Sequence, residues 1–294
     1  MKWRVRLVSL AALMSIVSPP ASHAQSSGSN DTIIVTGERP EQAKRKALAY
    51  VNELGVATGE RPAARWFDPI CPRAIGLSKE HEALVEDQIR RISREVGAPL
   101  AKAGCSANFA IAFTDGSDRV VRRIASGGEL SSDSARALKQ SKAPIRWWYG
   151  TEFRSRDGSP PSDVPLPSAF VDAPNFTTLP SGRSGNLFQY NSSIVSTQVV
   201  RAIRSATVVI DVQRANGLPL RSVVDYAALV GLSEIVLGAS PTDSILSLFR
   251  SGGNREITRP DRAFLASLYR IAMDRKAEQQ RRAIVQAMAK PKSN

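Results

Sequence analysis

The stretch LPLRSVVDYAALVGLSEI, residues 218–235, decides the fold of this chain. Its apolar side chains predict a central core helix over residues 219–236. The run ATVVIDV at residues 206–212 precedes it, and a nearly continuous apolar run of that length is typical of a strand buried in a sheet. Asn216-Gly217 lies between the two and favours a turn. We therefore expect a strand, a turn and a helix to form the centre of the protein.

Three other stretches predict helices that would pack around this centre. Residues 40–54 and 78–96 repeat apolar side chains at helical spacing. Thr258 and Asp261 have the spacing of a capping box, with Asp in place of Glu, and predict a terminal helix over residues 259–289. The second half of that helix is charged, so we expect it to project into solvent.

Two stretches predict further strands. Residues 107–114 alternate large and small side chains, and residues 145–149 read IRWWY. Residues 118–142 fit either short helices or loop. Together the patterns predict an α+β protein in which a small mixed sheet is packed by amphipathic helices.

Composition divides the chain into segments. Residues 154–187 are rich in Pro, Gly and Ser, which predicts a long irregular insertion. Around this insertion the expected order is a signal peptide at 1–24, a disordered or edge-strand segment at 25–37, an N-terminal α/β lobe at 38–153 and a C-terminal lobe at 188–294.

The first 24 residues have the pattern of an export signal. Lys2, Arg4 and Arg6 form a basic start, residues 7–17 are apolar, and Ser22-His23-Ala24 is a small-x-small cleavage sequence. The apolar run is shorter than the roughly 20 residues that span a bilayer. We therefore expect a periplasmic or secreted protein with no transmembrane segment after cleavage.

Both cysteines, Cys71 and Cys105, lie in the exported part. An oxidising compartment favours a disulfide between them. The alternative is a thiol nucleophile activated by His81, but neither cysteine lies in a recognisable activating motif.

The chain is basic, with a formal net charge of +13. Removing the signal, which carries three positive charges and no negative ones, leaves +10. Such an excess makes an anionic surface a possible partner, in addition to an unknown envelope component or protein. The basic residues are spread along the chain and aromatic residues are few, so we expect no nucleic acid partner and a solvated cationic surface.

The central stretch resembles the core of zincin-type metallopeptidases. In that family a helix bearing His-Glu-x-x-His is followed by Gly-Leu and later by a turn beneath the metal; here Gly231-Leu232 is followed by Ser-Ile-x-x-x-Phe at 244–249. Aligned on Gly231-Leu232, the two histidine positions fall at Val224 and Ala228 and the glutamate position at Asp225. The chain is thus similar to a group of uncharacterised exported bacterial proteins with a zincin-like scaffold that lack the ligand histidines.

This resemblance implies a zincin-like core with a helical C-terminal part but without the metal chemistry. A hydrolytic zinc site needs three protein ligands, and the mature chain contains one histidine, His81, on a different predicted helix. We expect no metal, no cofactor and no catalytic residue. A vestigial cleft would be lined by five residues, namely Asp225, Tyr226, Ala228, Trp147 and Tyr149.

Two acidic residues of the central stretch, Asp225 and Glu234, have alternative interpretations. Asp225 could act as a general base or bind a basic ligand group, or it could pair with Arg221 or be exposed as a structural residue. Glu234 is expected to face solvent or to bind a basic neighbour.

The aromatic pair Trp147 and Tyr149 also has two interpretations. Alternate residues of a strand share a face, so the pair could form an outer platform for sugar or peptide while Trp148 enters the core. Alternatively, an inserted lobe covers both faces.

Three functions are consistent with the sequence. The first is a non-catalytic envelope protein whose metal-free cleft binds a peptide, glycan or protein partner. The second is a metal-independent hydrolase that uses carboxylates such as Asp225 and Asp243. The third is a cationic structural protein whose basic C-terminal helix associates with the envelope.

Overall fold

The computed structural model describes residues 39–128, 130–159, 176–178, 187–189, 196–197 and 199–290. The predicted signal peptide and the segment at 25–37 lie outside the described residues, as does most of the predicted insertion. In the described part, no helix combines the length and the apolar composition that crossing a membrane requires.

A five-stranded mixed sheet is built around one long strand, β7 (Val199–Asp211). Along one edge, β4 (Ile145–Ser155) pairs with β7 antiparallel. Along the other edge, β1 (Ala64–Trp66) pairs in parallel with the first part of β7, and β3 (Phe109–Thr114) with the second part. The remaining strand, β2 (Pro72–Ile75), pairs with β3 in parallel. The expectation of a small mixed sheet with helices, and thus of an α+β protein, is confirmed.

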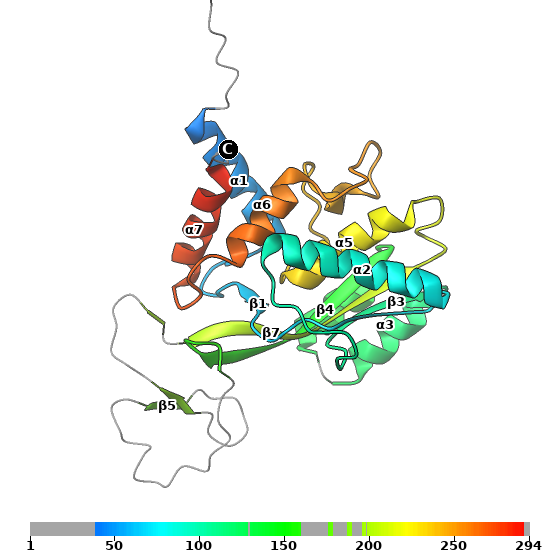
Figure 1. Cartoon of the computed structure of the whole chain (residues 1–294), viewed down its shortest axis with the longest axis horizontal. Helices are drawn as coiled ribbons and strands as arrows, with labels where there is room; N and C mark the ends of the chain where they lie inside the picture. The colour runs from blue at the N-terminus through cyan, green and yellow to red at the C-terminus, as the bar shows by residue number, and fades with distance from the viewer. Residues whose placement is uncertain are drawn as a thin grey trace, which may run out of the picture. The chain divides into compact units, whose positions relative to one another are not determined.

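The central helix α5 (Leu220–Leu232) follows β7 and is buried from Ser222 to its end. It lies next to α2 (Lys79–Val96) on one side of the sheet (Figure 1). Gly231 permits this close packing, because a Cβ at that position would lie 1.8 Å from Cζ of Phe109 on β3. The predicted order of buried strand, turn and core helix is therefore present.

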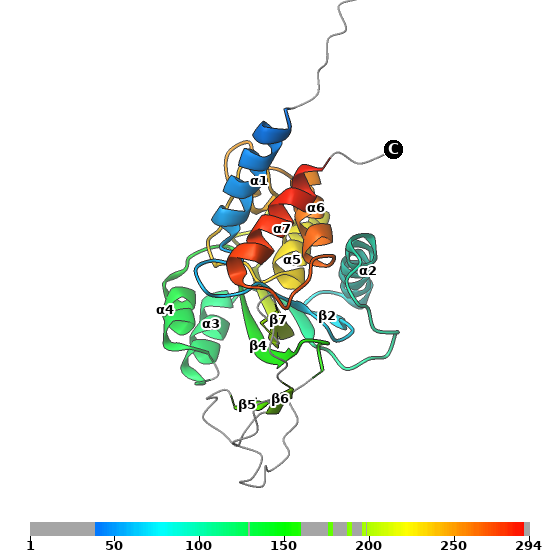
Figure 2. The same cartoon turned by 90° about the vertical axis from the view of Figure 1, so that its left-hand side faces the viewer.

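Residues 118–142, which the sequence left open, form a helical hairpin. Its helices α3 (Ser117–Ser126) and α4 (Ser132–Gln140) lie side by side next to β4 (Figure 2). Val121, Ala125 and Leu138 form a small apolar cluster of their own, against which Trp148 packs. Since successive residues of β4 face opposite sides, the hairpin covers the face of the sheet opposite to α5.

The expected terminal helix over residues 259–289 is wrong as a single helix. It is two helices, α6 (Arg259–Leu268) and α7 (Ala277–Ala289). The chain between them reaches the residues just before β7, where Asp274 O accepts a hydrogen bond from Thr197 N at 2.9 Å. The helix α7 does not project into solvent. Its buried Ile284 and Val285 belong to the main core, and it packs against α1 (Pro40–Leu54) (Figure 2).

The segments predicted as two lobes share one hydrophobic core. β7 comes from the C-terminal segment, whereas its partners β1, β3 and β4 come from the N-terminal one. The helices also pack across the two segments: α1 contacts α7, and α2 contacts α5. Contacts between distant parts of the chain therefore hold the molecule together.

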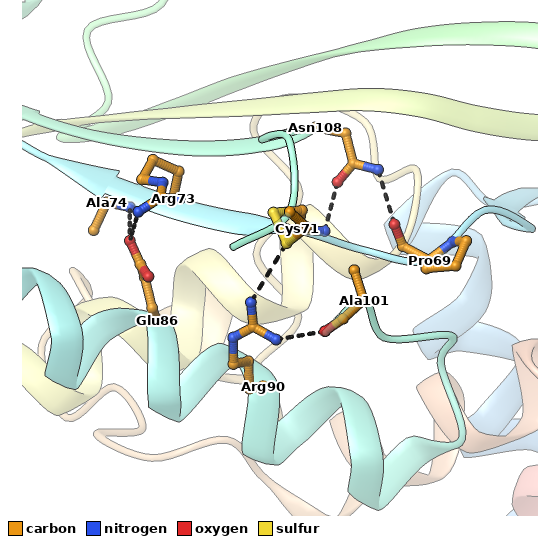
Figure 3. Close-up of a disulfide and its surroundings, with 9 residues drawn as sticks. Pro69, Cys71, Arg73, Ala74, Glu86, Arg90, Ala101 and Asn108 are labelled. Carbon is orange, nitrogen blue, oxygen red and sulfur yellow. Dashed lines mark hydrogen bonds and ion pairs between the residues drawn. A yellow bond between two sulfur atoms is a disulfide. The ribbon is translucent and has the colours of Figure 1, made fainter. Parts of the chain in front are cut away.

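The predicted disulfide between Cys71 and Cys105 is present, and it joins the approach to β2 with the approach to β3 (Figure 3). Asn108 strengthens the same junction: its Oδ1 accepts from Cys71 N at 2.7 Å and its Nδ2 donates to Pro69 O at 3.1 Å. Arg90 of α2 donates to Ala101 O at 2.8 Å from beneath. The bridge thus fixes the loop that follows α2 to the sheet on which that helix packs.

We expect the double substitution Cys71→Ser and Cys105→Ser to lower the free energy of unfolding by roughly 4 kcal/mol, because the bridge closes a loop with a sequence separation of 34. Urea denaturation of the variant and of the oxidised protein measures the difference. Dithiothreitol should destabilise the wild type by a similar amount and leave the variant unchanged. Equal midpoints for all four samples would contradict the stabilising role.

Candidate functional site

The C-terminal end of α5 is buried, so its last carbonyl groups need hydrogen-bond donors other than water. Each of the last four carbonyls has one from a side chain: Leu229 O from Ser233 Oγ (2.8 Å), Val230 O from the Tyr149 hydroxyl (2.6 Å), Gly231 O from Trp66 Nε1 (2.9 Å) and Leu232 O from the Tyr269 hydroxyl (2.7 Å). Three of the four donors are aromatic side chains, two from strands and one from the end of α6. The helix end is thereby fixed against the sheet.

Trp147 and Tyr149 share a face of β4, as predicted, but it is the inner face. Trp147 is 3% exposed, and its Nε1 donates to Ile235 O at 3.0 Å. The Tyr149 hydroxyl, besides its contact with Val230 O, lies 2.9 Å from Ser233 O and accepts from Ile235 N at 3.2 Å. Burial raises the pKa of Tyr149 well above its ordinary value, so this hydroxyl stays protonated and can donate.

Trp148 does not enter the main core, because it packs against the cluster under α3 and α4. The outer aromatic platform that the sequence allowed is therefore absent at these positions. The alternative, in which an inserted lobe covers both faces, stays a prediction, because most of the insertion lies outside the described residues. Within the described part, the main core lies against Trp147 and Tyr149 and the α3–α4 hairpin lies against Trp148.

A groove of about 540 Å³ runs beside β4. Five segments form it: the turn and loop between α1 and β1, the helix α4 with the two residues before it, the middle of β4, Arg204 of β7, and the residues after α5. Its walls include Arg61, Pro62, Asp133, Ser134, Ala137, Trp147, Trp148, Tyr149, Gly150, Thr151, Arg204, Glu234 and Val236.

The edge of β4 that faces away from β7 has unpaired peptide groups. Ala206 N donates to Asn108 O beside β3, and Asp211 N donates to Pro144 O beside β4, so the odd-numbered residues of this part of β7 direct their peptide groups toward β4. Trp148 is opposite Thr207 and bonds to it. By alternation, the peptide groups of Trp147 and Tyr149 point outward, and no described residue forms a backbone hydrogen bond with them on that side.

Most charged side chains of the groove gather around Glu234 at one end. Asp133 of α4 also lines the groove, and it pairs with Arg136 at 3.6 Å. Glu234 is 12% exposed and forms a bidentate pair with Arg201, with Oε2 to Nη1 at 2.6 Å and Oε1 to Nη2 at 3.0 Å. Arg61, 58% exposed, contacts Oε1 of the same carboxylate. Arg204 is exposed and also lines the groove. Glu234 is thus bound to basic neighbours, one of the two sequence alternatives, and this end of the groove carries more positive than negative charge.

Asp225, Tyr226 and Ala228 are buried and do not line the groove. Asp225 accepts hydrogen bonds from the Gln88 side chain of α2 and from Ile257 N at 3.0 Å, so it neither pairs with Arg221 nor reaches the surface. The sequence could not reveal this, because both donors come from distant segments.

Tyr226 fills the core between two aromatic neighbours. Its ring packs edge to face on Trp147 and on Phe249, with centroids 5.9 Å apart in each case. Its hydroxyl has no hydrogen-bond partner among the described residues, and burial raises the pKa of Tyr226. Of the five residues predicted to line a cleft, Trp147 and Tyr149 are the two that border the groove.

Within the described part of the chain, no group of three or more His, Cys, Asp and Glu side chains could hold a metal ion. Comparison with protein-family models, with curated proteins and with solved structures finds no match to this chain.

We expect Tyr149→Phe to lower the free energy of unfolding by about 1–3 kcal/mol, because the buried Val230 carbonyl and Ile235 amide lose their partner. Tyr226→Phe is the matched control. It removes a hydroxyl that has no hydrogen-bond partner among the described residues from another tyrosine of the same core, and it should change stability little. Urea denaturation measures both variants, and equal losses would show that the Tyr149 hydroxyl contributes nothing specific to the end of α5.

Proposed function

We propose that the groove beside β4 binds an extended, acidic segment of polypeptide, which adds to the free edge of β4 as a strand. The observation that carries the proposal is the outward direction of the Trp147 and Tyr149 peptide groups into a groove of about 540 Å³. Backbone groups of this kind pair with the main chain of a peptide in β-strand addition. A sheet edge left bare is otherwise a site of unwanted association.

The chemistry of the groove favours a peptide over a glycan. The Trp147 and Tyr149 rings are directed inward, where their donors bind carbonyls near the end of α5, and the Trp148 ring packs against the cluster under α3 and α4. Arg61 and Arg204 line the groove, where they would attract carboxylates of the bound segment, and the carboxylate of Asp133 in the same lining is paired with Arg136. Glu234 is already neutralised by the buried Arg201 and does not oppose them.

The remaining parts of the functional hypothesis stay predictions. Export to the envelope rests on residues 1–24, outside the described residues. The resemblance to metallopeptidase scaffolds rests on the order of β7, α5, Gly231-Leu232 and the 3-10 turn η2 (Ile245–Ser247). Val224 and Ala228, at the aligned histidine positions, are buried and border neither this groove nor the second pocket described below. For that reason we place the binding site at β4 and not on α5.

Neither alternative function gains a supporting observation. A hydrolase that used Asp225 would need that carboxylate to reach its substrate, and Asp225 is 1% exposed with both oxygens hydrogen-bonded. A structural protein that used a free basic C-terminal helix would need α7 to be available, and α7 packs into the core.

The proposal can be tested with fluorescein-labelled peptides of about eight residues, long enough for a typical strand. The first alternates Thr and Glu, the second alternates Thr and Lys, and the third replaces alternate residues of the first with Pro. We expect the Glu peptide to bind and the Lys peptide to bind at least about tenfold more weakly, since several surface charge pairs of 0.2–1 kcal/mol each are reversed. The Pro peptide should not bind, because it cannot donate the strand hydrogen bonds. Fluorescence anisotropy measures the dissociation constants.

Variants of the protein locate the binding. Arg204→Glu should weaken binding of the Glu peptide, whereas Arg119→Glu, an exposed arginine of α3 that lines no described pocket, should not. In hydrogen exchange, the Glu peptide should protect the Trp147 and Tyr149 amides. If the Pro peptide bound as tightly as the Glu peptide, strand addition would be refuted. If the two arginine variants weakened binding equally, the interaction would be general charge attraction and not binding at the groove.

A further inference from the structure

A second pocket, of about 370 Å³, is formed by the helices of the α3–α4 hairpin together with Arg146 of β4. It is distinct from the groove beside β4. Seven residues line it, four of them cationic: Asp118, Val121, Arg122, Ser126, Lys139, Lys142 and Arg146. The cations come from α3, from the end of α4 and the residues after it, and from β4, so the fold gathers charges that are dispersed in the sequence.

Arg146 is the buried member of this set. It is 1% exposed, and its Nη1 pairs with Asp118 Oδ1 at 2.7 Å while its Nη2 donates to Ser117 Oγ at 2.5 Å. Ser117 Oγ in turn donates to Asp211. The Arg146 Nε–H group is fully enclosed by protein and has no acceptor among the described residues. A buried charge with an unmet donor therefore borders the pocket.

The charges around the pocket do not balance. Asp118 is shared between Arg146 and Arg214, with Arg214 Nη2 to Asp118 Oδ2 at 2.8 Å, and Asp211 also contacts Arg214. The exposed Arg122, Lys139 and Lys142 form no ion pair with any described residue. The cluster has five cationic side chains and two carboxylates, so three positive charges are left over.

The lowered pKa of Asp118 is consistent with this excess of positive charge. Hydrogen bonds from Arg214, followed by those from Arg146, lower the pKa of Asp118 to about 2 although desolvation opposes them. The carboxylate is therefore already ionised and neutralised at neutral pH. It holds the two arginines in place and leaves the three exposed cations free to bind another anion.

We propose that the pocket between α3 and α4 binds a phosphate monoester group. Its dianion matches a cluster with three uncompensated cations, and Lys and Arg are the usual partners of phosphate oxygens. The volume is within the usual range of small-molecule sites, which is roughly 300–1,000 Å³, and leaves room for an organic substituent. The group could belong to a soluble ester or to the headgroup of a lipid, and both present the same chemistry to the pocket.

Two probes distinguish these sources, with ionic strength kept constant by sodium chloride. Isothermal titration calorimetry with glycerol 3-phosphate tests the soluble ester. Co-sedimentation with phosphatidylcholine vesicles, with and without phosphatidic acid, tests the membrane-bound one. Saturable binding to either probe supports the proposal; retention on the phosphatidic acid vesicles that glycerol 3-phosphate reverses assigns the site to lipid.

Variants test the location. Lys139→Glu with Lys142→Glu should weaken binding at least about tenfold, as expected when charge-assisted hydrogen bonds are lost. Lys102→Glu with Lys290→Glu changes the net charge equally at exposed positions outside the pocket and should leave the affinity within about twofold of wild type. The lysines are exposed, so folding should survive, and thermal denaturation checks this.

Two results would overturn the proposal. The first is the absence of saturable binding to both probes. The second is an equal loss of binding in the two double variants, which would show attraction to the overall charge instead of a site. Arg204→Glu should leave phosphate binding intact, so failure of this proposal and failure of the peptide groove are separate outcomes.

Discussion

The buried end of α5 imposes the constraint on which the rest of the structure depends. A helix that ends inside a protein leaves four carbonyl groups without intrahelical partners, and each would cost about 1–3 kcal/mol if left unmet. Here Ser233 and three aromatic side chains meet the requirement. Because those aromatic residues lie on β1, on β4 and at the end of α6, the helix cannot take its position unless all three are correctly placed.

This constraint explains why the groove has its composition. The Tyr149 and Trp147 side chains point toward the core and form hydrogen bonds there. The backbone edge of β4 is therefore the main part of these residues that faces the groove. Glu234 and Ile235 follow directly after the fixed helix end, and they form the wall opposite that edge. The groove is therefore a consequence of how α5 is anchored, and its shape should be as rigid as the core behind it.

Sequence patterns predicted the elements better than the site. The apolar runs identified β7 and α5, and helical periodicity identified α1 with bounds at Pro40 and Leu54, because such periodicity reports which residues are buried. Periodicity does not report which hydrogen-bond partner a buried polar group finds. Asp225 resembled a candidate cleft residue for that reason, whereas its partners Gln88 and Ile257 lie 137 and 32 positions away.

The cationic pocket between α3 and α4 also could not be predicted from the sequence. Its residues occur between Asp118 and Arg214 in a chain whose basic residues are spread throughout, and only the pairing of β4 with β7 and the packing of α3 on α4 bring them together. The break at Leu268 was missed because the apolar positions on either side of it continue a helical pattern, although the two halves pack on different neighbours.

The central place of β7 also affects how the chain can fold as it is made. Synthesis proceeds from the N-terminus, so β1, β3 and β4 all emerge before β7, the strand that joins them. Ala64 of β1, for example, cannot pair until Arg201 of β7 has been made. During that interval their edges are bare, and unpaired edges of this kind associate with other chains. Nascent chains that stop short of residue 199 should therefore need protection by a chaperone, and the sheet should close late and in one cooperative step.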